Sequence, residues 1–242
     1  MWAPDRTHPP RRPRRATGAN GSERTNAQGE ATRELIILAA EAMFSERGIE
    51  ATPLRDIAVA AGQRNNVAVQ YHFGDRATLL SAIVGYRVRR SDELRTARFA
   101  DLLARGRPPE PRDLVATFVT SLAGHLEDGN HYLRFLSRYV VETGGYDGLS
   151  GHAGGGTVVT IRELLRRQLA DCPHPVFEER WIQTMTTTVH TLARYQRLMS
   201  IGQLPAPIDE LVDDLVTCLT ASLEAPVGAD DALAEPAARH EG

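Results

Sequence analysis

Helical periodicity is the feature of this 242-residue chain that most limits its fold. Between residues 30 and 224, apolar side chains recur at intervals of three and four, and no convincing stretch alternates with a period of two. The first such stripe consists of Ile36, Ala39, Ala40, Met43 and Phe44. Glycines and prolines stand where helices usually end or begin. The sequence therefore predicts an all-α protein of about nine helices.

The helix boundaries follow from these stripes and from the residues at their ends. Thr52 is predicted to be the N-cap of the second helix, with Pro53 as its first residue, and Asp75 to cap the fourth. One helix is expected to follow Pro111, and seven glycines make residues 143–156 a loop. The other helices are expected at residues 31–47, 53–61, 66–73, 76–105, 130–142, 157–170, 175–202 and 207–224.

The two ends of the chain differ in composition from the middle. Residues 1–29 are rich in Pro, Arg, Gly, Thr and Asn and contain almost nothing to bury, so they predict a disordered basic arm. Residues 225–242 predict a disordered tail. Between them we expect a helix-turn-helix domain at 30–76 and a larger helical domain at 77–224.

The 28 basic residues are all arginines, and the absence of lysine removes several kinds of enzyme. Walker-type phosphate loops, pyridoxal enzymes and Ser-x-x-Lys hydrolases each need a lysine. The segment Gly148-Leu149-Ser150-Gly151-His152 misses the nucleophile-elbow spacing by one position, and no dinucleotide or metal-ligand spacing occurs. We therefore expect no catalytic activity, no cofactor and no metal.

Cysteine usage and apolar run lengths bear on the compartment. Cys172 and Cys218 stand in no CxxC spacing, so the sequence indicates a reducing cytoplasm rather than a disulfide scaffold. The longest apolar run, residues 35–40, is far too short to span a membrane.

Charge is divided unevenly along the chain. Residues 1–90 carry 14 arginines and 9 acidic residues, a net charge of +5, whereas residues 91–242 carry 14 arginines and 22 acidic residues, a net charge of −8. A basic first part and an acidic remainder indicate that the first part binds a polyanion while the second has another task.

The first three expected helices carry a helix-turn-helix pattern, because the second and third are short and joined by a tight turn after Ala61-Gly62. The surrounding residues resemble the amino-terminal signature of the TetR family of transcriptional regulators. The matching positions are Thr32-Arg33-Glu34, Ala39-Ala40, Phe44, Glu46-Arg47-Gly48, Thr52, Arg55-Asp56-Ile57-Ala58, Ala61-Gly62, Tyr71-His72-Phe73-Gly74, Arg76 and Leu79-Leu80.

The resemblance covers residues 31–85 of the chain, with two departures. The turn is one residue longer than the common family form, and Arg76 stands where the family usually has lysine. The resemblance implies a DNA-binding head and a larger domain that dimerises and binds a small effector.

Candidate DNA contacts combine residues able to read base edges with residues suited to phosphates. Asn and Gln can pair with adenine and Arg with guanine, whereas the family contacts the backbone at positions matching Thr52, Tyr71, His72 and Arg76. The full set is Thr52, Arg55, Gln63, Arg64, Asn65, Asn66, Gln70, Tyr71, His72 and Arg76.

The larger domain offers candidates for an effector pocket and for a dimer interface. The resemblance implies a pocket lined by Phe99, Phe118, Leu122, His125, Tyr132, Phe135, Tyr139, Trp181, Met185 and His190. The last two helices are apolar enough to form an intermolecular four-helix bundle. The interface residues expected there are Leu192, Tyr195, Met199, Leu211, Leu215 and Leu219.

We therefore predict a homodimeric, sequence-specific transcriptional regulator, a ligand-responsive repressor that binds a pseudo-palindromic operator. Two alternatives remain open from sequence. One is a helical interaction protein whose basic end binds nucleic acid without sequence preference. The other is a regulator of the same kind that has no effector.

Overall fold

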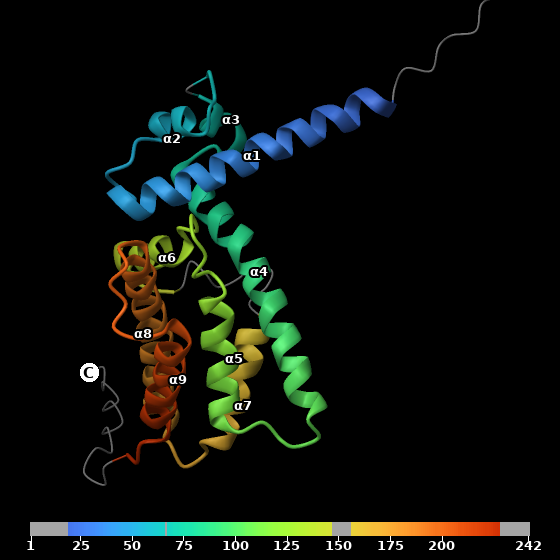
Figure 1. The fold of residues 1–242 in the computed structure, drawn as a ribbon. Helices are drawn as coiled ribbons and strands as arrows, with labels where there is room; N and C mark the ends of the chain where they lie inside the picture. Colours follow the sequence, from blue (N-terminus) through green and yellow to red (C-terminus); the bar gives the residue numbers. More distant parts are fainter. Residues whose placement is uncertain (1–18, 66, 147–155, 228–242) are drawn as a thin grey trace, which may run out of the picture.

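The computed structural model describes residues 19–65, 67–146 and 156–227, and within these ranges every regular element is a helix (Figure 1). This confirms the all-α prediction. The helices are α1 (Ala19–Arg47), α2 (Leu54–Ala60), α3 (Ala68–Phe73), α4 (Arg76–Ala104), α5 (Pro111–Ala123), α6 (Tyr132–Thr143), α7 (Gly156–Gln168), α8 (His174–Ser200) and α9 (Ile208–Glu224). No described helix combines the length and apolarity needed to cross a bilayer.

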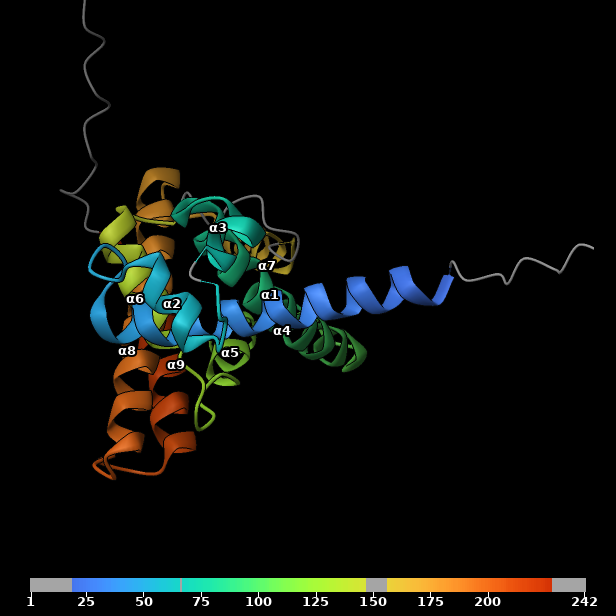
Figure 2. The ribbon, with the colours of Figure 1, turned by 90° about the horizontal axis from the view of Figure 1, so that it is seen from above.

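Helix α1 is longer than predicted. It begins at Ala19, so the prediction of a disordered arm is wrong for residues 19–29, while residues 1–18 lie outside the described part of the chain. The segment contains no proline, and adding residues to a helix that is already packed avoids the cost of nucleation. As a result the amino-terminal part of α1 projects sideways from the rest of the molecule (Figure 2).

The head of the molecule consists of α1, α2, α3 and the start of α4 (Figure 1). Its core is formed by apolar side chains that are almost completely buried. They are Ile36, Ala40, Phe44, Ile57, Ala58, Val69, Phe73 and Leu79. The two shortest helices could not bury enough surface alone, and α1 supplies the apolar face on which they stay folded.

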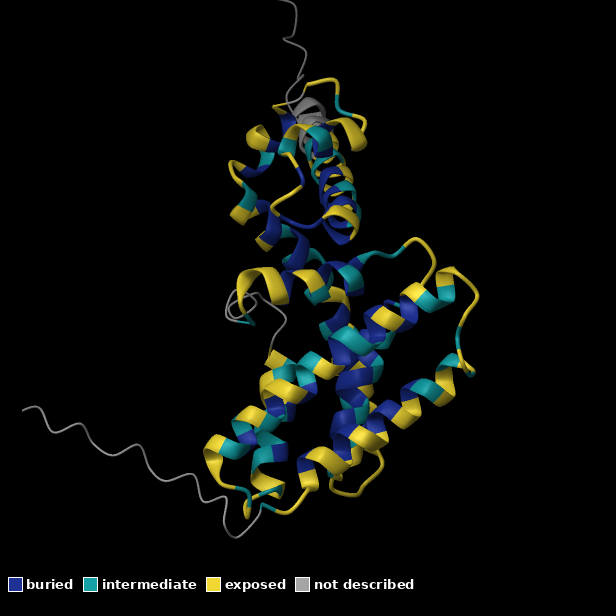
Figure 3. Ribbon diagram, turned by 90° about the vertical axis from the view of Figure 1, so that its left-hand side faces the viewer, coloured by how far each residue is buried: buried dark blue, intermediate teal, exposed yellow. Residues whose placement is uncertain are grey.

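The body of the molecule is a bundle of α4 to α9 with α5 at its centre. Helix α5 packs against α4, α7, α8 and α9, so its side chains are buried on nearly every side (Figure 3). Its buried residues are Leu114, Val115, Thr117, Phe118, Val119, Ser121 and Leu122. A helix with neighbours on so many sides must be apolar around much of its circumference, which explains why its apolar stripe is so broad.

Two predicted helix ends can be compared with the structure. Asp75 caps α4 as predicted, because its side chain accepts a hydrogen bond of 2.7 Å from the backbone amide of Thr78. Thr52 does not cap α2, whose N-cap residue is Pro53. The Thr52 hydroxyl instead donates to the carbonyl oxygen of Gly48 at 2.7 Å, one turn back along the chain.

The head joins the body through a contact of α1 with α6. The Phe44 ring lies stacked against Phe135, with 6.3 Å between ring centroids, and both side chains are fully buried. This aromatic pair gives head and body one continuous hydrophobic core.

We expect the substitution Phe44→Ala to lower the free energy of unfolding by about 3–5 kcal/mol, because it leaves a cavity where the two cores meet. Urea unfolding followed by circular dichroism measures this loss. Leu35→Ala is the control, since Leu35 lies on the same helix but is 52% exposed. A Phe44→Ala loss as small as that of the control would contradict the shared core.

Candidate nucleic-acid interface

Helix α2 packs on α1, α3 packs on α2 and α4, and residues 61–67 join α2 to α3. Gly62 adopts a φ of +69°, which lets the chain turn sharply after α2. The amide of Gln63 then donates to the Ala58 carbonyl oxygen at 2.9 Å and closes the helix end. This is the geometry of a helix-turn-helix.

The outer surface of α2, the turn and α3 carries polar side chains. Tyr71 is 83% exposed, and Arg55, Arg64, Asn65 and Gln70 are exposed as well. These five predicted DNA-contact residues are therefore accessible to a ligand on the helix-turn-helix. Another candidate, Asn66, lies outside the described residues.

Local hydrogen bonds hold part of this surface in place. The Asn65 side chain accepts a hydrogen bond of 3.1 Å from the Val67 amide, which shapes the turn before α3. Partly buried Gln63 donates from its side-chain nitrogen to the Ala61 carbonyl oxygen at 3.1 Å. Gln63 therefore braces the turn, whereas the Gln70 side chain is exposed on α3.

Two residues predicted to contact phosphates face the protein interior instead. Thr52 is fully buried, so its hydroxyl cannot reach DNA in this structure. Arg76 is half-buried: its guanidinium donates to the Ile49 carbonyl oxygen and lies over the Phe44 ring, 5.9 Å from the centroid. Both side chains stabilise the segment between α1 and α2, a role that sequence spacing alone could not distinguish from phosphate binding.

Arg33 on α1 contacts the carboxyl end of α3, and sequence reasoning gave this residue no role of its own. Its guanidinium donates to the His72 carbonyl oxygen at 2.9 Å and lies 4.3 Å from the centroid of the Phe73 ring. A cation at the carboxyl end of a helix is favourable, because the carbonyl groups there carry partial negative charge. The His72 ring is partly buried and meets the exposed Tyr71 ring edge-on at 5.1 Å.

Two exposed valines on the same surface were also missed. Val59 on α2 is 70% exposed and Val67 before α3 is 54% exposed. Apolar side chains on a helix-turn-helix surface can contact the methyl group of thymine. The sequence could have indicated their exposure, because both valines fall outside the apolar stripe of their segment.

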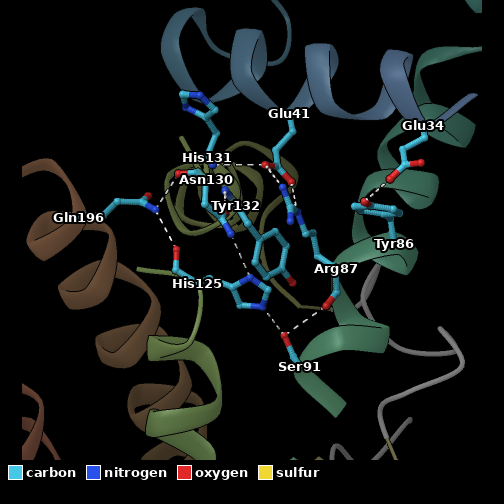
Figure 4. Close-up of polar contacts among 10 residues, drawn as sticks. All are labelled: Glu34, Glu41, Tyr86, Arg87, Ser91, His125, Asn130, His131, Tyr132 and Gln196. Carbon is cyan, nitrogen blue, oxygen red and sulfur yellow. Dashed lines mark hydrogen bonds and ion pairs between the residues drawn. The ribbon is translucent and has the colours of Figure 1, made fainter. Parts of the chain in front are cut away.

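A buried ion pair lies where the head meets the body (Figure 4). The Glu41 carboxylate on α1 is almost completely buried and accepts from Arg87 on α4 at 2.6 and 2.8 Å, one bond to each oxygen. It also accepts from the His131 backbone amide at 3.3 Å. This bidentate geometry fixes α1 relative to α4, and the third bond ties both to the start of α6.

His125 lies just behind this ion pair and is fully buried (Figure 4). Its Nε2 lies 2.8 Å from the Ser91 hydroxyl, and its Nδ1 lies 3.4 Å from the Asn130 side-chain nitrogen. Burial, with added repulsion from Arg87 and nearby arginines, lowers the pKa of His125 from 6.5 to about 4. The imidazole is therefore neutral at neutral pH.

A second set of contacts joins α6 to the end of α1. Arg138 donates from Nε to the Ser45 carbonyl oxygen at 2.9 Å, and Glu142 accepts from the Ile49 amide at 2.9 Å. Gly48 lies between them with a φ of +93°, and a Cβ there would be 3.3 Å from the Glu142 carboxylate. The turn that leads into α2 is thus held by α6.

The predicted pocket residues form a packed core in this structure. Phe118 and Trp181 lie 5.3 Å apart between ring centroids, His125 and Tyr132 lie 4.8 Å apart, and Phe135 and Tyr139 lie 5.9 Å apart. Leu122 is buried, whereas Phe99, Met185 and His190 are partly exposed. The His190 ring lies 2.6 Å from the Ser137 hydroxyl, which links α8 to α6.

The predicted dimer residues mostly face inward. Leu192, Tyr195, Leu215 and Leu219 are all at most 7% exposed within a single chain, because α9 packs on α5 and α8 packs on α6. Only Met199 and Leu211 are partly exposed. Leu192, Tyr195, Leu215 and Leu219 therefore contribute first to the core of the single chain, and their contact with a second subunit stays a prediction.

A small helix-turn-helix head with a polar outer surface, set on a larger helical body, defines a DNA-binding regulator. Comparison with known families identifies which kind. Residues 36–83 match the model described as bacterial regulatory proteins of the tetR family, and residues 112–222 match the tetracyclin repressor-like C-terminal domain. The chain belongs to the TetR family of transcriptional regulators, as its sequence motif indicated.

Individual relatives agree with this assignment. The chain is 42% identical over 79 residues to the HTH-type transcriptional repressor BepR of Brucella suis biovar 1 (strain 1330). This match spans 31% of the chain and 37% of the repressor, so the two proteins share one region rather than their full lengths.

Solved structures show the same fold at low sequence identity. A TetR family transcription regulator from Marinobacter aquaeolei VT8 is 14% identical, with a TM-score of 0.57 over 81% of this chain and 97% of that one. A protein from Shewanella sp. PV-4 assigned to the same family is also 14% identical, with a TM-score of 0.57 over 78% and 95%.

The low pKa of His125 predicts a pH-dependent stability. The folded chain resists protonation of His125 until about pH 4, whereas the unfolded chain takes up the proton near pH 6.5. Stability from this group is therefore complete above pH 6.5 and is lost as the pH falls toward 4, by up to about 3 kcal/mol.

Urea unfolding of the native chain and of His125→Gln between pH 7 and 4.5 tests this expectation. The variant should show the shallower loss of stability over that interval. His174→Gln, which removes an exposed histidine, is the control. Parallel pH profiles for the native chain and His125→Gln would contradict the argument.

Proposed function

We propose that this protein is a homodimeric transcriptional repressor whose two heads bind a pseudo-palindromic DNA operator. The carrying observation is the outward surface of α2, the turn and α3, where Arg64, Asn65, Gln70 and Tyr71 stand exposed on a braced helix-turn-helix. The similarity to a transcriptional repressor supports repression rather than activation.

The exposed residues divide by chemistry into two kinds of contact. Gln70 and Asn65 carry amides that can pair with adenine, and Arg55 and Arg64 carry guanidinium groups that can pair with guanine. The Tyr71 hydroxyl suits a phosphate oxygen and positions the head without reading sequence. In this proposal Asn66 and His72 remain contacts, while Thr52 and Arg76 act from inside the head.

The proposed dimer uses the outward side of α8 and α9. The exposed apolar side chains of this region are Ile182 on α8 and Ile201 directly after it, and α9 adds the small exposed residues Cys218 and Ala221. Small side chains allow close approach of a symmetry-related helix pair, and the inward faces are already covered by α5 and α6.

Ligand control is the part of the proposal that rests on the family resemblance. An effector would act by favouring one of two head spacings through its differential affinity for them. The tightly packed aromatic side chains of the body would have to rearrange to admit it. A thermal-shift screen of small molecules tests this step, because a ligand specific for the folded state raises the melting temperature.

The main alternative is a protein that binds nucleic acid through charge alone. It would show the same affinity for every sequence and a steep dependence on salt. The positive net charge of residues 1–90 and the negative net charge of the remainder are compatible with this alternative. The hydrogen bond from Arg33 that holds α3 favours sequence recognition, because a purely electrostatic surface needs no fixed helix.

Selection of bound duplexes from a random pool tests the proposed function. We expect the full-length protein to enrich one pseudo-palindromic sequence, with half-sites separated by about one helical turn or a multiple of it. Enrichment of no sequence over the starting pool would contradict the proposal and favour charge-driven binding.

Substitutions of two neighbouring residues on α3 should distinguish base recognition from contact with the DNA backbone. Gln70→Ala should change the base preferred at one position of each half-site, worth about 1–3 kcal/mol of discrimination. Tyr71→Phe removes only a hydroxyl and should weaken binding by about 1 kcal/mol on all sequences alike. Anisotropy titrations with the selected duplex and its single-base variants measure both. An equal loss of affinity for all duplexes on Gln70→Ala would show that Gln70 does not recognise a base.

A further inference from the structure

The short connection between α5 and α6 is bonded to three other helices at once (Figure 4). At its start, His125 bonds to Ser91 on α4. At its end, the His131 amide donates to Glu41 on α1. Between these points the connection is held by Gln196, which comes from α8. One connection of seven residues, 125–131, therefore touches the head, the long helix below it and a helix of the proposed dimer interface.

Gln196 uses both of its donor hydrogens on this connection. Its side-chain nitrogen donates to the His125 carbonyl oxygen at 3.0 Å and to the Asn130 carbonyl oxygen at 2.7 Å. The side chain is 8% exposed and points into the protein, away from the outward side of α8. A buried amide that bridges two carbonyls five residues apart holds the connection in one conformation.

The hydrogen bonds continue from the connection to the head. The Asn130 side chain accepts from the Tyr132 amide at 2.9 Å, a local turn contact that orients the peptide just before α6. That orientation directs the His131 amide at Glu41, whose carboxylate is already held by Arg87. Each hydrogen bond along the path from Gln196 to Glu41 therefore depends on the position of the group held by the previous one.

We propose that Gln196 is a positioning residue for operator recognition: it holds the connection 125–131 so that the bonds to Glu41 keep the head at one angle to α8. The inference rests on the proposed function, because an angle between head and dimer helix matters only when two heads must meet two half-sites.

Loss of the two Gln196 hydrogen bonds should affect how the two heads bind DNA together and not how either head binds alone. Without the two Gln196 bonds, the connection gains conformational freedom and the His131 amide is no longer held against Glu41. Each head then samples a range of angles, so binding both half-sites at a fixed separation costs more entropy. Contacts of a single head with a half-site stay as they are, since α2 and α3 are untouched.

The test compares Gln196→Met with the native protein on duplexes made from the selected operator. Methionine has a similar length but no donor hydrogens. Affinity is measured by anisotropy for the full operator, for operators lengthened or shortened by one base pair between half-sites, and for a single half-site. Gln168→Met is the matched control, because Gln168 also donates to a carbonyl oxygen, that of Pro109, but at the exposed end of α7.

We expect Gln196→Met to bind the full operator about 5- to 10-fold more weakly and to lose preference for the native spacing by the same factor. Its affinity for the half-site should stay within about twofold of native, and Gln168→Met should match the native protein throughout. Gln196→Asn, which keeps the donors on a shorter side chain, should recover part of the spacing preference and decides the matter if Gln196→Met does not fold.

Two results would overturn the inference. One is a native spacing preference in folded Gln196→Met or, where that variant does not fold, a Gln196→Asn variant that recovers no spacing preference. The other is an equal loss on operator and half-site together with a lower melting temperature, which would show that Gln196 acts only through stability. Failure of the proposed function is a separate result, because the native protein itself would then select no operator.

Discussion

The Glu41 carboxylate is the charge around which head and body are arranged. A carboxylate taken out of water is costly unless its oxygens are all engaged, and here they accept from Arg87 and from the His131 amide. The three partners belong to α1, α4 and the start of α6, so satisfying one buried charge fixes three helices. Glu41 is almost completely buried, and a hydrogen bond in such surroundings is electrostatically stronger than one in water.

Arginine does two kinds of work in this lysine-free chain. Arg33, Arg87 and Arg138 bind carbonyl oxygens or a carboxylate of other helices with their planar forks. Arg55 and Arg64 stay exposed on the helix-turn-helix surface. The guanidinium group suits both tasks because it offers several donors in fixed directions and is less strongly hydrated than an ammonium group. Sequence position alone did not separate the two groups, as the inward turn of Arg76 shows.

Much of the candidate interface could be foreseen from short-range rules. Gly62 and Asp75 mark helix ends because backbone geometry and amide capping act within one turn, and the exposed polar residues of α3 lie outside its apolar stripe. The braces behind that surface could not be foreseen. Arg33 and the His72 carbonyl are 39 positions apart, and their contact depends on how α1 crosses α3.

Local sequence therefore determined the helices, their apolar faces and the family of this protein, since periodicity and caps operate within a few residues. Only the tertiary structure decided what each apolar face meets. Leu215 and Leu219 lie on a broad apolar stripe that would suit a second subunit, yet both are buried within a single chain, where α9 packs on α5 and α8. Hydrophobic burial is proportional to area and has no direction, so a stripe specifies that a helix must be covered but not which neighbour covers it.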